Sequence, residues 1–315
     1  MPKTVWQSLN HDSILTSVEE VMEEKLSNLI LRRNSYINRV YELEKNDPQE
    51  RFIVKYYRPG RWTKGMIYEE HKFLYELYDK EVPVIRPLQF GDKTLFDVEK
   101  FHFAIFPKKG GRALDEFDKD SWEEIGRLLA RVHLVGATHK KSKRIVWRPS
   151  TVTKHHLEAL SKSDYVLPEF KKSFQTAAEM FVKKAEPLFK GQEFILLHGD
   201  CHKGNLIHRP NEGIFVVDFD DICLGSPVQD VWMLLPDAPD KCEKELEWFL
   251  KGYKTFRPFD KASFNLIPVL RGMRIIHYAS WLAVQSKEPD FHNHFPKAGT
   301  KGYWSELIKE LYEVT

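Results

Sequence analysis

Two short apolar runs, each followed at once by acidic and amide side chains, constrain this chain more than any other feature. The runs are 194–197 and 214–217, and the polar groups that follow them lie within residues 198–221, HGDCHKGNLIHRPNEGIFVVDFDD. In order, these polar side chains are Asp200, Asn205, Asp218, Asp220 and Asp221. Apolar flanks place such groups at the edge of a core, where clustered carboxylates repel one another and lose hydration. A bound cation would offset that cost.

Asp and Asn side chains offer hard oxygen ligands, which suit Mg²⁺. Phosphoryl transfer from ATP uses the same set: one carboxylate accepts the proton of the attacking hydroxyl, while an amide and a second carboxylate hold Mg²⁺. We therefore predict an ATP- and Mg²⁺-dependent phosphotransferase, with Asp200 as catalytic base and Asn205 and Asp218 as metal ligands. Asp220 either assists the metal or substrate or only shapes the turn. A single Asp would more simply cap a turn, so the prediction depends on the combined pattern.

The first third of the chain has the pattern of short strands with one helix. β-branched and aromatic residues alternate in short runs separated by polar turns, one of which is 45–48. The expected elements are a hairpin of strands 37–43 and 51–57, a helix over 65–78, and two strands near 94–99 and 102–106.

The segment 107–111, PKKGG, is the best candidate for a linker because Gly-Gly disfavours both helix and strand. Beyond it helices dominate, and the last two apolar runs are short strands. We expect one helix that begins at a capping box in 121–124, a second over 169–189 and a third over 264–285. The layout predicts an α+β fold of two lobes, residues 1–107 and 108–315, with a ligand cleft between them.

The overall charge gives no reason to expect a polyanionic partner. Lys and Arg number 48 against 46 Asp and Glu, so the net charge is +2. The N-terminus lacks the pattern of a signal peptide, no run of ~18 apolar residues is present, and three cysteines do not form a disulfide framework. We expect a monomeric cytoplasmic protein that binds neither nucleic acid nor membrane.

Two further segments are expected to be structural. The basic run 140–144, KKSKR, reads as a solvated loop, with nucleic-acid binding or reception of an acidic or phosphorylated substrate as alternatives. The helix over 264–285 has apolar residues at helical spacing, which predicts a core-facing stripe. The residues expected in that core are Leu270, Met273, Ile276 and Trp281.

The motif HGDxHxGN, followed by an apolar strand and Asp, resembles the catalytic and metal loops of the aminoglycoside phosphotransferase/choline kinase-like superfamily. A closer resemblance, to the bacterial stress response kinase A family (the YihE/RdoA type), is carried by VKYYRPGRWT, LHGDCHKGN, VVDFDD, PVQDVWML and LRGMRIIHYASWL. These segments extend from about residue 34 to residue 285. The resemblance implies a two-lobed protein-kinase-like fold and a cytoplasmic Ser/Thr protein kinase linked to stress.

Carried over to this chain, the resemblance makes Lys55 the lysine that anchors the nucleotide phosphates. Glu70 should pair with Lys55, and Glu69 is its competitor. Ser35 lies in the loop that takes the position of the phosphate-covering turn, which here lacks the Gly-rich pattern of protein kinases. Asp230 resembles a buried aspartate that supports the catalytic loop from behind.

The phosphate acceptor stays open at this point. No recognisable APE segment or long activation loop follows Asp218, which weakens the analogy with kinases that are switched by phosphorylation. A small-molecule kinase of the homoserine, choline or aminoglycoside type is the alternative to a protein kinase. A catalytically inactive nucleotide-binding module is the third hypothesis, and the intact set Lys55, Asp200, Asn205 and Asp218 argues against it.

Overall fold

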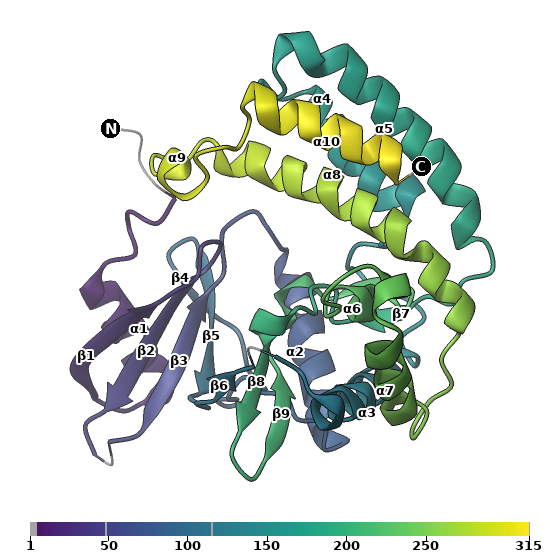
Figure 1. Cartoon of the computed structure of the whole chain (residues 1–315). Helices are drawn as coiled ribbons and strands as arrows, with labels where there is room; N and C mark the ends of the chain where they lie inside the picture. Colours follow the sequence, from purple (N-terminus) through teal and green to yellow (C-terminus); the bar gives the residue numbers. More distant parts are fainter. Residues whose placement is uncertain (1–4, 48, 115, 315) are drawn as a thin grey trace.

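A five-stranded antiparallel sheet forms the N-terminal part of the molecule, with strand order β1-β2-β3-β5-β4 (Figure 1). The computed structural model describes residues 5–47, 49–114 and 116–314. β2 and β3 form the predicted hairpin, and Pro48 of its turn lies outside the described residues. The strands are β1 (Leu26–Arg33), β2 (Arg39–Lys45), β3 (Arg51–Tyr56), β4 (Phe96–Val98) and β5 (Phe101–Pro107).

The two faces of β3 meet different partners because successive side chains of a strand point to opposite faces. Phe52, Val54 and Tyr56 are buried in a core that includes residues of helix α1 (His11–Met22). Lys55 lies between them in sequence and faces the other side, toward helix α2 (Lys64–Asp79). The alternation therefore directs this lysine into the space between the sheet and the rest of the chain.

Helix α1 contradicts the expectation of a single helix in the first third of the chain. Asn10 caps it: Ser13 N donates to Asn10 Oδ1 at 2.9 Å, and Asn10 N donates to Ser13 Oγ at 3.0 Å. Ile14, Val18 and Met22 recur at helical spacing and are buried. Strand β1 was also not predicted; among the described residues it pairs with β2 alone, at the edge of the sheet, and it has little buried surface.

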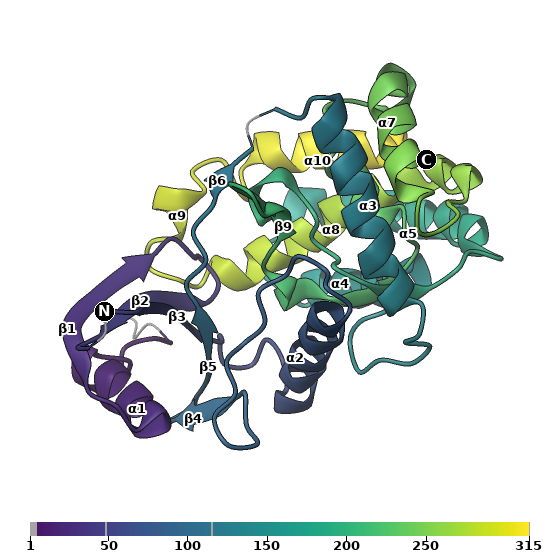
Figure 2. The same cartoon turned by 90° about the horizontal axis from the view of Figure 1, so that it is seen from below.

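Helix α2 confirms the predicted helix over 65–78 and lies between the sheet and the C-terminal part (Figure 2). Its first turn is capped by Thr63, whose Oγ1 accepts from Met66 N at 3.3 Å. Its buried face carries apolar residues together with two polar ones, which is unusual for a helix that packs only for stability. The buried residues are Ile67, Glu70, His71, Phe73, Leu74 and Leu77.

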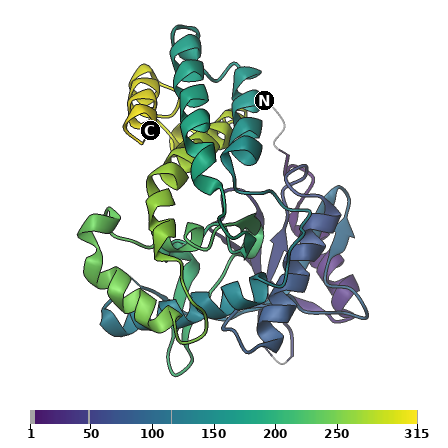
Figure 3. The ribbon, with the colours of Figure 1, turned by 90° about the vertical axis from the view of Figure 1, so that its right-hand side faces the viewer.

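The C-terminal part is mainly helical and contains two small sheets, of order β10-β7 and β6-β8-β9. α4, α5, α8 and α10 gather at one end, whereas α3 packs against α7 at the other (Figures 1 and 3). This arrangement confirms the predicted α+β fold with a sheet-rich part and a larger helical part.

None of the helices in the described ranges is long and apolar enough to cross a lipid bilayer. The helices are α3 (Lys119–Gly136), α4 (Lys154–Ser161), α5 (Lys171–Ala185), α6 (Gln229–Trp232), α7 (Glu243–Tyr253), α8 (Ile267–Gln285), α9 (Phe291–His294) and α10 (Lys301–Glu313). The strands are β6 (Arg112–Ala113), β7 (Ile195–Leu197), β8 (Leu206–Arg209), β9 (Gly213–Val216) and β10 (Cys223–Gly225).

The ends of two predicted helices differ from the sequence analysis. Helix α3 is capped by Asp118, whose Oδ1 accepts from Ser121 N at 2.9 Å, so the predicted capping box in 121–124 is wrong. The helix expected over 169–189 is α5, and short 3₁₀ turns extend it at both ends. At the start of α3 several polar residues could serve as caps, and local sequence does not choose between them.

Gly136 allows helix α3 to lie directly against strand β7. A Cβ atom at Gly136 would lie 2.0 Å from Leu196 O, which is far inside van der Waals contact. Leu196 and its neighbours on β7 are fully buried, and β7 leads into the residues 198–205 that carry the predicted chemistry. The close approach of helix and strand therefore fixes the start of that loop.

Gly136→Ala should lower the free energy of unfolding by about 2–3 kcal/mol, because backbone atoms of α3 and β7 would have to separate. Chemical denaturation of the purified protein measures this. The matched control is Gly302→Ala in α10, where a Cβ meets only Thr300 Oγ1 at 4.0 Å. That substitution should leave stability unchanged or raise it by up to about 1 kcal/mol. Equal effects of the two changes would contradict the packing argument.

Candidate active site

The two predicted loops, 198–205 and 217–221, lie side by side because the strands next to them are paired. β8 and β9 form a hairpin that begins directly after the first loop and ends before the second. Val217 N donates to Asn205 O at 2.9 Å, which joins the loops directly. β7 pairs with β10, with Leu197 opposite Cys223, and closes the arrangement from the other side.

Asp230, at the start of α6, holds the first loop from behind. Its carboxylate accepts from His198 N at 2.9 Å and Gly199 N at 2.8 Å, and it lies 3.2 Å from His133 Nε2. Burial opposes its charge, but the hydrogen bond from His133 and the nearby imidazoles outweigh burial and lower the pKa of Asp230. Gly199 has φ +84°, and a Cβ there would lie 2.1 Å from Asp221 O, so the position requires glycine.

Lys55 meets carboxylates from both parts of the chain. Its Nζ lies 3.2 Å from Asp218 Oδ1, 3.2 Å from Asp220 Oδ1 and 3.7 Å from Glu70 Oε1. Glu69 does not take this place, because its side chain accepts from Lys143 N at 2.9 Å. Burial opposes the charge of Lys55, but the carboxylates outweigh it and raise the pKa of Lys55 well above its ordinary value.

Asp220 is the centre of a buried ionic cluster that the sequence analysis did not foresee. Its side chain is 3% exposed, and its carboxylate forms ion pairs with Lys55 and Arg61 and accepts from Asn38 Nδ2 at 3.2 Å. Arg144 Nη2 donates to Asp220 O at 2.8 Å and lies 3.6 Å from Glu70 Oε2. The interpretation of 140–144 as a solvated loop is therefore wrong for Arg144, which is buried.

The pKa values of the two buried carboxyl groups in this cluster, Asp220 and Glu70, shift in opposite directions. Burial disfavours ionised Asp220, but Lys55, Arg61 and Arg144 outweigh burial and lower the pKa of Asp220. Burial raises the pKa of Glu70, and Lys55 and Arg144 compensate only in part. Asp220 is therefore the firmly ionised partner of Lys55, and Glu70 is the weaker one.

Asp200 and Asp218 line one cavity, and hydrogen bonds join Asn205 to both of their loops. Asp200 Oδ1 lies 2.7 Å from Arg274 Nη2 of α8. Asn205 Nδ2 donates to Asp200 O at 2.9 Å, and this bond leaves Asn205 Oδ1 as the atom able to bind a cation. Asp218 adopts φ +61°, a left-handed conformation uncommon for residues other than glycine, and its side chain is 57% exposed.

This donor set fits Mg²⁺ that is shared with a nucleotide. Within residues 5–47, 49–114 and 116–314, no group of three or more His, Cys, Asp or Glu is arranged to hold a metal. Asn205 and Asp218 each carry a hard oxygen donor, and Mg²⁺ in nucleotide sites typically takes few protein ligands and completes its shell with phosphate oxygens and water. The residues present are compatible with such an ion.

Two neighbouring cavities share Asp200 as part of their walls. One, of about 520 Å³, is lined by Lys55, Glu70 and Asp218, and we call it the nucleotide cavity. The other, of about 650 Å³, is lined by Arg274 and by aromatic residues of α8, and we call it the acceptor cavity after the role proposed for it below. The Lys55 amine and the Asp218 carboxylate thus lie in a common cavity, as the kinase interpretation requires.

Ser35 lies between β1 and β2 and lines the nucleotide cavity. Trp281 corrects the expectation for α8, because it is half-buried and lines both cavities instead of the core. Leu270, Met273 and Ile276 are buried in the core as predicted.

Comparison with known proteins agrees with this geometry. The sequence profile of the phosphotransferase enzyme family matches residues 29–264. Stress response kinase A of Escherichia coli (strain K12) is 35% identical over 304 residues, which cover 95% of this chain and 90% of the relative. The chain belongs to the phosphotransferase enzyme family. Serine/threonine protein kinase RdoA of Salmonella typhimurium is 34% identical over 318 residues, covering 98% of this chain and 94% of that protein.

Solved structures of other phosphotransferases share the fold. Amicoumacin kinase hAmiN, in complex with AMP-PNP, Ca²⁺ and Ami, has a TM-score of 0.75 at 17% identity and covers 96% of this chain and 92% of its own. Choline kinase LicA from Streptococcus pneumoniae has a TM-score of 0.66 at 16% identity and covers 96% of this chain and 99% of its own. The family match and the shared fold make this phosphotransferase an ATP-dependent kinase.

Sequence reasoning missed Arg61, Arg144 and Arg274 of this phosphotransferase. Arg61 forms ion pairs with Asp220 and Asp221, and Arg274 reaches Asp200. Their signal in the sequence is weak, because each arginine lies far along the chain from the acid that it meets. Within the helix α8, one usable signal existed: Arg274 is a charged residue between buried Met273 and Ile276.

His71 gives the phosphotransferase a predicted pH dependence of stability. It is buried behind Lys55, with Nε2 3.0 Å from Tyr57 OH and Nδ1 2.8 Å from Thr94 Oγ1. Burial, and then the charges of Lys55 and Arg144, lower the pKa of His71 from 6.5 to about 3. Below pH 6.5 the unfolded chain binds a proton here that the folded chain does not bind until about pH 3.

This group alone should therefore lower the free energy of unfolding by up to about 1.4 kcal/mol for each pH unit between 6.5 and 3. Denaturation of the wild type and of His71→Gln at pH 7.5, 6.0 and 5.0 measures it. The difference in stability between the two proteins should shrink as the pH falls. A difference that stays constant over this range would contradict a neutral buried imidazole.

Proposed function

We propose that this kinase transfers the γ-phosphate of ATP to serine or threonine hydroxyls of a polypeptide, with Asp200 as the catalytic base. The observation that carries the proposal is the position of Asp200 in the wall shared by the nucleotide and acceptor cavities. The names of the relatives, stress response kinase A and serine/threonine protein kinase RdoA, support the polypeptide acceptor. An inactive nucleotide-binding module fits poorly, because Lys55, Asp200 and Asp218 line one cavity.

Each residue of the site has a role in the proposed reaction. Lys55 binds the phosphates of ATP, and Glu70 supports it from α2. Asp200 accepts the proton of the acceptor hydroxyl as the oxygen attacks the γ-phosphate, and Arg274 orients its carboxylate. When bound, Mg²⁺ neutralises phosphate charge, and Asn205 and Asp218 are the residues that would hold it. Backbone N–H groups of the Ser35 loop cover the phosphates.

The charges of the acceptor cavity favour an acceptor without positive charge. Its two carboxylates, Asp200 and Asp221, are each paired: Asp221 Oδ1 lies 2.6 Å from Arg61 Nη2, and Asp200 contacts Arg274. Aminoglycosides and choline are cations, which unpaired carboxylates would attract more strongly than carboxylates already paired with arginines. A serine or threonine side chain is uncharged and needs no carboxylate partner.

A small-molecule kinase is the second candidate. The solved structures that share the fold include kinases named for amicoumacin and choline. Trp147, Tyr278 and Trp281 in the acceptor cavity offer aromatic surfaces that would suit the apolar face of such an acceptor. A direct comparison of acceptors therefore decides between the two candidates.

The proposal also includes two lobes, residues 1–107 and 108–315, that close over ATP about the segment 107–111 and exclude water. The ion pairs of Lys55 with Asp218 and Asp220 support this division, since the lysine comes from one lobe and the acids from the other. A monomer in the cytoplasm, where ATP is abundant and its three cysteines stay free, completes the proposal.

Purified protein with Mg²⁺ and γ-labelled ATP should label itself or a generic protein acceptor. Asp200→Asn should reduce that transfer by about 10²–10⁴-fold, because the hydroxyl loses its proton acceptor. Asp164→Asn, the same change at an exposed position outside both cavities, is the matched control and should have no effect. Transfer to an amino alcohol, sugar or homoserine without any transfer to polypeptides would replace the protein kinase by the second candidate.

Asn205→Ala should raise the Mg²⁺ concentration needed for half-maximal activity by on the order of 10-fold or more, because it removes one of two protein ligands. Titration of activity with MgCl₂ at fixed ATP measures this, and excess EDTA should abolish activity in every variant. Asn28→Ala, at an exposed position of β1, serves as control. An unchanged Mg²⁺ requirement in Asn205→Ala would remove this residue from the metal site.

A further inference from the structure

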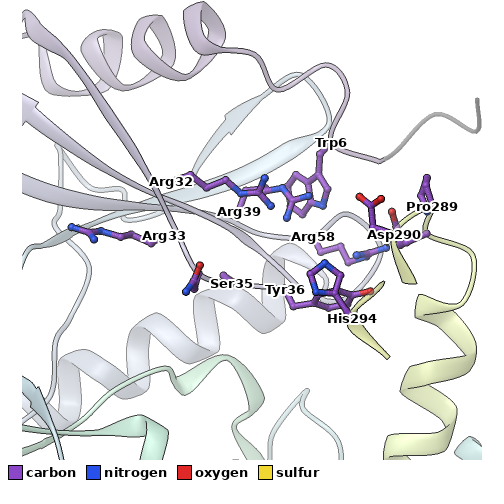
Figure 4. A pocket seen from close by; sticks show the side chains of 12 residues that line it. Trp6, Arg32, Arg33, Ser35, Tyr36, Arg39, Arg58, Pro289, Asp290 and His294 are labelled. Carbon is purple, nitrogen blue, oxygen red and sulfur yellow. Dashed lines mark hydrogen bonds and ion pairs between the residues drawn. The ribbon is translucent and has the colours of Figure 1, made fainter. Parts of the chain in front are cut away.

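A third cavity, of about 590 Å³, opens between the sheet and the segment that follows α8 (Figure 4). We call it the arginine pocket. One wall comes from β1, β2 and the loop between them, and the other from residues 288–294. Its lining includes Trp6, Arg32, Arg39, Arg58, Glu288 and Asp290.

The arginines of this pocket carry more positive charge than nearby acids neutralise. Arg58 is paired with Glu288, and Arg33, which extends away from the others in Figure 4, is paired with Glu42. Within the described parts of the chain, neither Arg32 nor Arg39 has a carboxylate oxygen within 4.0 Å. Burial and the charge of Arg32 lower the pKa of Arg39, which reflects cations placed together.

Aromatic packing holds Arg39 in place without consuming its hydrogen-bond donors. Its guanidinium carbon lies 5.1 Å from the centre of the Trp6 ring, and Trp6 is buried and stacks on Phe101 at 5.2 Å. Arg32 reaches toward the same place in Figure 4. A guanidinium fixed by its face keeps its N–H edges for an oxyanion, and Arg39 together with the exposed Arg32 matches the charge of a phosphate dianion.

The pocket lies next to the acceptor cavity. The centre of the Tyr36 ring lies 5.3 Å from the centre of the His294 ring on the pocket side and 5.5 Å from the centre of the Trp281 ring. Trp281 in turn lines the acceptor cavity. Tyr36 and Ser35 also line the nucleotide cavity. One aromatic layer therefore separates the arginine pocket from the place where the acceptor hydroxyl would lie.

We propose that the arginine pocket binds a phosphorylated serine or threonine side chain of the polypeptide acceptor, at a position apart from the hydroxyl to be phosphorylated. This rests on the proposed protein kinase function. The ligand is a phosphorylated polypeptide segment and not free phosphate, because inorganic phosphate would fill only a small part of the cavity. The acidic wall with Glu288 and Asp290 leaves room for basic side chains of the same segment.

The test is a binding measurement that does not depend on phosphate transfer. Fluorescent peptide libraries with a fixed central phosphoserine, or with serine instead, are titrated into Asp200→Asn protein that is saturated with AMP-PNP and Mg²⁺. Phosphoserine should improve affinity by at least about 10-fold, because charge-assisted bonds to two arginines are gained. The double variant Arg32→Gln/Arg39→Gln, made in the same protein, should lose this gain.

Two further variants separate specific phosphate binding in the pocket from general attraction by positive charge. Arg39→Lys preserves charge and fold but cannot form a planar two-donor contact, so it should lose part of the gain. Arg51→Gln removes an exposed arginine of β3 that does not line the pocket, and it should leave the affinity unchanged. Thermal denaturation of each variant verifies that it is folded.

Equal affinity for the phosphoserine and serine libraries would overturn the proposal. So would an Arg51→Gln effect as large as that of the double variant, because this would indicate unspecific attraction. Inorganic phosphate that binds as tightly as the phosphopeptides would assign the pocket to the free anion. Phosphopeptide binding together with phosphate transfer only to small molecules would reject the protein kinase function while the pocket itself stands.

Discussion

The buried ammonium group of Lys55 is the charge on which the rest of the site depends. Removing an ion from water is costly, and the cost is offset here only because Asp218, Asp220 and Glu70 surround the amine. Lys55 comes from the sheet, Glu70 from α2, and the aspartates from the loop after β9, so one cation connects three segments that are distant in sequence. Arg61 and Arg144 share the same acids and complete the cluster. The fold around the nucleotide cavity is thus organised by charge pairing as well as by apolar packing.

The sequence was sufficient wherever structure and chemistry are written in contiguous residues. The hairpin β2–β3, helix α2 and strands β7 and β9 follow from short periodic runs, and the order of sheet-rich and helical parts follows from them. The segment 198–221 brings Asp200, Asn205 and Asp218 together because β8 and β9 form a local hairpin. Lys55 was proposed from the family resemblance, and its place on a strand whose alternate residues are apolar agrees with that proposal. Their assigned roles in catalysis are proposals that the variants described above test.

What the sequence did not reveal are partners brought together by tertiary structure. Arg144 belongs to the same basic run as the exposed lysines Lys140 and Lys141. Only the fold shows that Arg144 is buried against Trp62 and Asp220. Asp220 looked like a turn residue, because its contacts with Lys55 and Arg61 span more than 150 positions of the chain. Trp281 has the helical spacing of a core residue, yet α8 ends beside the cavities, where no residues cover it fully. In each case the burial of the side chain depends on which segment, distant in sequence, packs against it.

Helix α8 is continuous from Ile267 to Gln285 and touches both parts of the molecule. Near its middle, Arg274 contacts the carboxylate of Asp200, and just beyond its end Glu288 is paired with Arg58 from the sheet. A continuous helix transmits displacement along its axis because its hydrogen-bonded turns resist bending. Any rotation of the sheet that keeps the Arg58–Glu288 pair would therefore pull on Arg274. Under the proposed function, helix α8 would therefore link the orientation of the Asp200 carboxylate to the position of the sheet.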